Sequence, residues 1–116
     1  MKGDSFVERW FAAGDSGELD SFDDFLHPDV VVHAPMGLST VGPEAEKEVW
    51  RDALRAMPDI RHDIQEVIEV GSSIAARVIV TGTLEGDFAG IAGNGRSFTV
   101  DQGLFVHVRD GKIVEA

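Results

Sequence analysis

Two titratable side chains, His33 and Asp101, have the chemistry and the setting to transfer protons to a small molecule. His33 lies near the end of an apolar run at 30–34, beside the loop that follows, and an imidazole exchanges protons near neutral pH. Asp101 lies in the apolar run 98–108. A β-bulge there would turn its carboxyl into an apolar cavity, where burial raises the pKa towards the range of a general acid. We therefore predict His33 and Asp101 as catalytic residues.

Each candidate also has a structural interpretation. His33 suits a surface or capping position equally well. Asp101 points outward if the strand alternates regularly, and Arg77 on the neighbouring strand would then pair with it across the sheet. His107 shares the face of Asp101, and we expect it at an interface between subunits. These alternatives remain open on the sequence alone.

Large apolar side chains in this chain suit the lining of a pocket for a flat hydrophobic ligand, because rings and flexible thioethers adapt to such a shape. A lone amide on an otherwise apolar strand face needs a hydrogen-bonding partner, which makes Gln102 the expected polar contact. The alternative is that the apolar residues form only the core. The predicted ligand-binding residues are Gln102, Trp50, Met36, Met57, Phe88, Leu84 and Leu104.

The sequence gives little support for a metal-binding site or for a phosphate-binding loop. His27 with Asp29 and His62 with Asp63 are two scattered pairs, whereas a metal site needs three or four converging ligands, so we predict no metal. Glycines in the segment 90–95 superficially resemble a nucleotide loop, but they join two strands instead of leading into a helix. We expect a flap over a pocket mouth here and predict no cofactor.

The composition narrows the class of protein. The chain has 116 residues, no cysteine, and 21 acidic against 10 basic residues, for a net charge of −11. Such a field repels phosphate backbones and anionic membranes, so we expect neither nucleic acid nor membrane as a partner. Charges at Glu8 and Arg9 interrupt any apolar leader, and a cytoplasmic location is expected. The length fits one domain.

Apolar residues recur at helical spacing in three N-terminal segments. A first helix, capped by Asp4 or Ser5, is expected to end at Gly14. A short second helix follows at about 18–26. A third runs from Pro43, which suits a first turn, to about residue 57.

The remainder of the chain has the composition of β-strands. Because no helix interrupts the last four strands, they predict an antiparallel meander with helices on one face, an α+β fold. The expected strands are 30–34, 60–70, 74–84, 98–108 and 112 onward.

Five segments of the chain carry a family pattern: 27–35 (HPDVVVHAP), 57–61 (MPDIR), 82–91 (GTLEGDFAGI), 94–96 (NGR) and 108–115 (VRDGKIVE). In order and approximate spacing they resemble SnoaL-like polyketide cyclases, which belong to the nuclear transport factor two-like superfamily. The resemblance covers nearly the whole chain. It implies a cone in which three N-terminal helices and a curved, mostly antiparallel sheet enclose an apolar pocket, and a homodimer formed through the outer sheet face.

The resemblance also implies cofactor-free acid/base chemistry next to a carbonyl, of the polyketide cyclase or isomerase type, on an apolar or aromatic small molecule. The chain departs from the pattern at Leu84, Leu104 and Ala34, where polar residues are frequent in the family. We expect this domain, residues 1–116, to lack the C-terminal end of its last strand, and a longer chain to carry a Trp and the family's acid/base Asp beyond Ala116. A non-catalytic binder of an apolar molecule and a structural dimerisation module are the alternatives.

Overall fold

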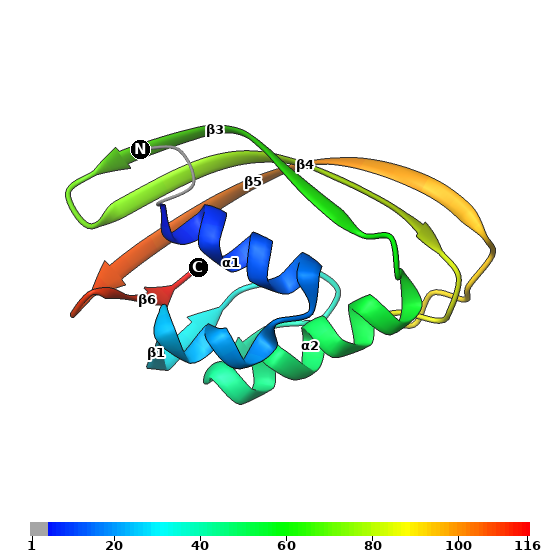
Figure 1. Ribbon diagram of the computed structural model, residues 1–116, viewed down its shortest axis with the longest axis horizontal. Helices are drawn as coiled ribbons and strands as arrows, with labels where there is room; N and C mark the ends of the chain where they lie inside the picture. Colours follow the sequence, from blue (N-terminus) through cyan, green and yellow to red (C-terminus); the bar gives the residue numbers. More distant parts are fainter. Residues whose placement is uncertain (1–4) are drawn as a thin grey trace.

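One six-stranded sheet curves over the helices in the computed structural model, which describes residues 5–116 (Figure 1). The strand order is β2-β1-β6-β5-β4-β3, and every neighbouring pair is antiparallel except β1 and β6. The helices lie together on the concave side of the sheet. This arrangement confirms the predicted α+β fold. Its elements are α1 (Phe6–Ser16), the 3-10 helix η1 (Leu19–Asp24), β1 (Leu26–Val32), β2 (Thr40–Val41), α2 (Pro43–Ala56), β3 (Arg61–Val70), β4 (Ser73–Leu84), β5 (Arg96–Arg109) and β6 (Lys112–Glu115).

Helix α1 has well-formed caps at both ends. Ser5 is the N-cap, and its Oγ accepts a hydrogen bond from the Glu8 backbone N–H at 3.1 Å. The alternative cap, Asp4, lies outside the described residues. Gly17 ends the helix in the left-handed conformation, with φ of 79°, which glycine adopts without a steric penalty.

Gly14 does not end α1, so the predicted helix end is wrong: the helix runs on to Ser16. Gly14 serves packing instead. A Cβ at this position would lie 2.4 Å from the ring atom Cζ3 of Trp50, far inside van der Waals contact. The missing side chain therefore lets the indole of α2 lie directly against the backbone of α1.

The segment after α1 differs from the sequence expectation in two ways. The second helix is the short 3-10 helix η1, and β1 begins at Leu26 rather than at residue 30, ending before His33. Pro28 is tolerated inside β1 because the pairing with β6 is irregular between Leu26 and Val31, where the missing N–H costs no ladder hydrogen bond. The parallel β1–β6 pairing was not predicted, since it joins the two ends of the sequence.

Alternation along β4 and β5 separates the concave face from the convex face. The inward positions Ile74, Ala76, Val78 and Val80 of β4 are all buried, and Leu84, which continues this face, is half-buried. On β5, Val106 is fully buried, and Gln102 and Leu104 follow on the same face, half-buried. Val100 continues this face but is 49% exposed, so the concave side is open towards the beginning of β5.

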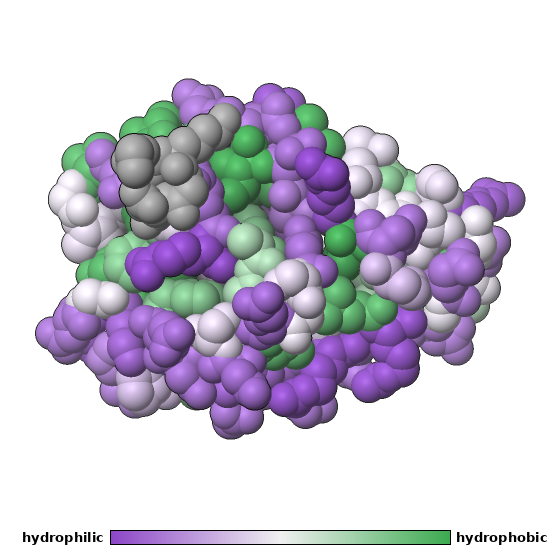
Figure 2. Space-filling model, in the orientation of Figure 1, coloured by the Kyte–Doolittle hydropathy of each residue, from purple (hydrophilic) through white to green (hydrophobic). Residues whose placement is uncertain are grey.

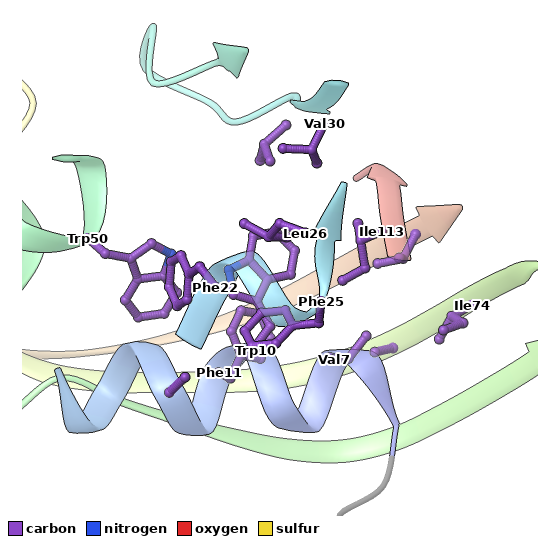
Figure 3. Packing of buried hydrophobic residues seen from close by; sticks show 14 of the residues in the cluster. Val7, Trp10, Phe11, Phe22, Phe25, Leu26, Val30, Trp50, Ile74 and Ile113 are labelled. Atoms are coloured by element: carbon purple, nitrogen blue, oxygen red, sulfur yellow. The ribbon is translucent and has the colours of Figure 1, made fainter. Parts of the chain in front are cut away.

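The main core lies between α1, α2, η1 and the concave face of the sheet (Figure 3). Its fully enclosed side chains include Val7 from α1, Phe22 from η1 and Ile113 from β6, so every layer contributes. Hydrophobic burial of this kind contributes about 25 cal/mol for each Å² removed from water. Along the described part of the chain, no helix has the length and apolar character needed to cross a membrane.

Candidate active site

An aspartate–histidine pair joins the end of α1 to the start of β3. The Nδ1 atom of His62 lies 2.7 Å from Oδ1 of Asp15, and the backbone N–H of His62 donates to Oδ2 of the same carboxylate, also at 2.7 Å. Since a carboxylate only accepts, the imidazole donates through Nδ1–H, and this fixes the tautomer in which Nε2 carries the lone pair. The pair has the chemistry of a general base and its orienting carboxylate.

Aromatic rings frame the His62 imidazole inside the molecule. Phe11, one helical turn before Asp15 on α1, stacks on it with ring centroids 4.5 Å apart and planes at 18°. Trp50 of α2 lies tilted at 5.1 Å. The His62 side chain is 9% exposed. Such a frame restricts the ring to one orientation.

The second ring nitrogen of His62 is available for chemistry. Within residues 5–116, Nε2 has no protein hydrogen-bond partner. Among the described residues, the enclosed polar side-chain atom without a partner is Trp10 Nε1. The His62 side chain keeps an exposed fraction of 9%. A base needs this combination of a free lone pair and access.

His33, predicted as catalytic, lies just beyond the end of β1 and is exposed. Its Nε2 lies 2.8 Å from a carboxylate oxygen of Glu115 at the end of β6, and its backbone N–H donates to the Ala116 carbonyl. These contacts tie β1 to β6 at the surface, which supports the structural interpretation of this histidine.

Asp101, the other predicted catalytic residue, is on the convex face of β5. Arg77 of β4 donates to both of its oxygens, from Nε at 3.0 Å and from Nη2 at 2.6 Å. This hydrogen bonding raises the pKa of the Arg77 guanidinium. Both side chains are exposed, and the described structure gives Asp101 and His33 different partners on different strands.

The predicted ligand-binding residues lie in four different surroundings. Met57, Leu84 and Phe88 come together in one apolar cluster that also contains Ala53, Ala56, Ile60 and Phe98. Trp50 belongs to the main core, and Met36 is an exposed loop residue with φ of 62°. Gln102 and Leu104 face the concave side of β5, and within residues 5–116 the Gln102 amide has no hydrogen-bond partner.

A hollow of about 470 Å³ opens beside the Met57 cluster, between α2 and the loop 85–95. Its wall combines the apolar Leu38, Val49 and Phe88 with the polar Asp52 and Arg55. Figure 2 shows hydrophobic surface where the long strands and α2 face each other, flanked by hydrophilic residues over the outside of α2. An apolar floor with a polar rim suits a hydrophobic small molecule.

The loop 85–95 is anchored at its base. The backbone N–H groups of Glu85 and Gly86 both donate to the Ala56 carbonyl, at 2.9 and 3.0 Å, which fastens the loop to the end of α2. Nearby, Thr83 donates to the Asp59 carboxylate from its hydroxyl and its backbone N–H, and these hydrogen bonds lower the pKa of Asp59. The loop is therefore held to the end of α2 at its base.

Metal ligation is not evident in the part of the chain that the structure describes. No group of three His, Cys, Asp or Glu side chains gathers there in a way that could hold an ion.

Comparison with known proteins identifies the family. The model of the SnoaL-like polyketide cyclases matches residues 5–116. The chain belongs to this family. None of the curated proteins matches the sequence.

Several solved structures superpose over almost the whole chain. IdmH, a putative polyketide cyclase from Streptomyces antibioticus, is 26% identical, with a TM-score of 0.81 over 99% of this chain and 88% of its own. TsrD from Streptomyces laurentii is 24% identical, with a TM-score of 0.85 over 95% and 81%. A putative SnoaL-like polyketide cyclase from Jannaschia sp. CCS1 is 19% identical, with a TM-score of 0.84 over 95% and 78%. The nuclear transport factor two-like fold is therefore shown.

The residues that sequence reasoning missed in this SnoaL-like chain are Asp15 and His62. The sequence suggests His62 only as a possible metal ligand together with Asp63, its outward neighbour. Two signals could have found the pair. His62 and Ile64 alternate towards the core on β3, and Phe11 and Asp15 are four residues apart, which places them on one face of α1.

Proposed function

We propose that the chain is a cofactor-free acid/base enzyme of the polyketide cyclase or isomerase type, with His62 as the general base. The observation that supports this is the Asp15–His62 pair, which presents a lone pair at Nε2 in an aromatic, largely enclosed setting. The family supplies the class of small-molecule chemistry. His62 thus takes the role that the sequence alone suggested for His33 or Asp101.

The proposed reaction begins with proton removal next to a carbonyl. Nε2 of His62 takes the proton, the C–H electron pair becomes an enolate, and the Asp15 carboxylate stabilises the imidazolium that results. Returning the proton to another carbon completes an isomerisation. Attack of the enolate on a second carbonyl forms a C–C bond and closes a ring, and the new alkoxide takes the proton back from Nε2.

The concave face supplies the features that the substrate would need. The half-buried Gln102 amide is a donor for the developing enolate oxygen, and the Met57, Leu84 and Phe88 cluster offers an apolar surface. The net charge of −11 disfavours an anionic substrate. We therefore propose an uncharged apolar or aromatic ketone, which Leu84, Leu104 and Ala34 accommodate without polar competition.

An NMR titration with α-tetralone, a bicyclic aromatic ketone, tests this proposal. We expect the ring resonances of His62 to move on addition of the ketone, and the protein in D₂O to exchange the protons beside its carbonyl. His27, a half-buried histidine 3.9 Å from Asp29 and from Asp110, is the matched internal control and should not respond. A response of His33 with a silent His62 would contradict the proposal and favour the His33 alternative.

Binding without catalysis is the second candidate, because Leu84, Leu104 and Ala34 leave the predicted pocket positions apolar. In that case the Asp15–His62 contact would be only a tie between α1 and β3. Ketone-dependent shifts of apolar residues, without proton exchange and without a response of His62, would support this candidate.

We also propose a homodimer through the convex face of the sheet. Ile68, Ala75 and Phe105 are register partners on β3, β4 and β5 and form one outward row, in which Phe105 is 73% exposed. Exposed apolar patches of this kind mark protein interfaces.

We expect sedimentation to show a dimer that Phe105→Ser dissociates. Val41→Ser, at an equally apolar position that is 74% exposed on β2, is the control and should leave the dimer intact. A monomeric wild type, or a dimer that survives Phe105→Ser, would argue against this interface.

A further inference from the structure

A glutamate lies buried in α2, one helical turn before Trp50. Glu46 is 5% exposed, and burial raises the pKa of its carboxyl. Its Oε1 accepts a hydrogen bond from Oγ1 of Thr40 in β2, and its Oε2 accepts one from Nε1 of Trp50, both at 3.0 Å. A buried carboxyl is costly unless it is hydrogen-bonded, and here both oxygens have donors.

The indole that Glu46 holds is a wall of the His62 site. Trp50 lies 5.1 Å from His62 and 6.1 Å from Phe11 between ring centroids, so the three rings touch one another in turn. The missing side chain of Gly14 sets how close the indole comes to α1. The hydrogen bond to Glu46 sets how the indole is turned, because it is the directional contact of an otherwise apolar ring system.

We propose that Glu46 is a positioning residue for His62: by holding Nε1 of Trp50, it fixes the aromatic wall that orients the imidazole towards the substrate. This inference rests on the proposed function, in which Nε2 of His62 is the base. In this role Glu46 neither touches substrate nor exchanges a proton. Its carboxyl acts through Trp50, and a displacement of about 1 Å at a catalytic group can cost about 10²-fold in rate.

The test compares two substitutions that differ in what they offer to Trp50. Glu46→Gln keeps an acceptor for Nε1, and its amide N–H₂ can donate to the hydroxyl of Thr40, so the network survives with one bond reversed. Glu46→Ala leaves Nε1 without an acceptor. We expect Glu46→Ala to shift the His62 ring-proton resonances, which sense the ring currents of Trp50 and Phe11, and to slow α-tetralone proton exchange by up to about 100-fold. Glu46→Gln should restore both.

Two further variants keep the test decisive. Trp50→Phe retains a ring but loses Nε1, and should slow α-tetralone proton exchange as Glu46→Ala does. Its exchange rate replaces that of Glu46→Ala if that variant does not fold. Thr40→Val removes the other hydrogen bond of Glu46 and should leave His62 unchanged. A folded Glu46→Ala protein with wild-type His62 resonances, or a folded Trp50→Phe protein with the wild-type exchange rate, would overturn the proposal.

The outcomes also separate this inference from the proposed function. If the resonances move as expected but even the wild type exchanges no ketone protons, the positioning holds and the catalytic proposal fails. The opposite outcome is a wild type that exchanges protons through His62 and a Glu46→Ala protein with the same exchange rate and the same His62 resonances. In that case the catalytic proposal holds, and the proposal that Glu46 positions His62 fails.

Discussion

Replacing His62 by Asn should lower the rate of ketone proton exchange by about 10²- to 10⁴-fold, the usual contribution of a general base. The Asn amide occupies the place of the Nδ1–H group, so it can still donate to Asp15, while the Nε2 lone pair is lost. The substitution therefore removes the proposed base with little change to the contact between α1 and β3. The rate is measured by NMR as the loss of the α-proton signal in D₂O.

Asp15→Asn is the companion of this experiment and should reduce the rate to a similar extent. The Asn carbonyl satisfies the His62 backbone N–H, and its amide then donates to Nδ1, which moves the imidazole proton to Nε2. Such a tautomer has no lone pair at Nε2 to accept the substrate proton, and the equivalent change in a Ser-His-Asp triad costs about 10⁴-fold. Asp63→Asn, at an exposed neighbour of His62, is the control. If the folded His62→Asn protein exchanges ketone protons as fast as the wild type, His62 is not the general base.

Gly14→Ala should destabilise the protein by about 1–3 kcal/mol, the range for overpacking in a core. The sign is the informative part, because Gly→Ala inside a helix ordinarily stabilises by about 0.5–1 kcal/mol. Here the new Cβ would meet three atoms of the Trp50 ring at 2.4 to 2.6 Å, and the indole is itself packed into the main core. The free energy of unfolding is measured by urea denaturation.

A double-mutant cycle with Trp50→Leu provides the control for Gly14→Ala. Leucine is smaller than the indole, so the added methyl group fits, and the helix preference of alanine should make the second substitution neutral or stabilising in that background. The same loss of stability in both backgrounds would show that the Trp50 contact is not the cause.

Local patterns in the sequence were sufficient for most of the fold. The alternation of Ile74, Ala76, Val78 and Val80 records a sheet face directly, and Pro43 marks the start of α2. The family resemblance predicted how these helices and strands are arranged in space. The wrong predictions concern residues whose spatial neighbours lie far along the chain. Gly14 resembles a helix end in the sequence, but it is a glycine because the Trp50 ring of α2 leaves no room for a side chain there.

The candidate site was harder to predict for the same reason. Asp15 and His62 are 47 residues apart, and the carboxylate and imidazole meet only because α1 packs under the start of β3. The sequence directed attention to residues that stand out locally, such as His33 beside a loop and Asp101 within an apolar strand. Their partners, Glu115 and Arg77, are also distant in sequence and were placed by pairing of the strands.

The parallel pairing of β1 with β6 bears on how the chain folds. Phe25 and Val31 accept backbone hydrogen bonds from Ile113 and Ala116, so this strand pairing joins segments that lie far apart in the sequence. Contacts of this kind carry a high loop-closure entropy and form slowly. On the ribosome, the N-terminal helices and β1 would wait for residues 112–116 to emerge, because these supply the neighbouring strand. Until then the apolar side chains that β1 and η1 bury against β6 would remain exposed to water.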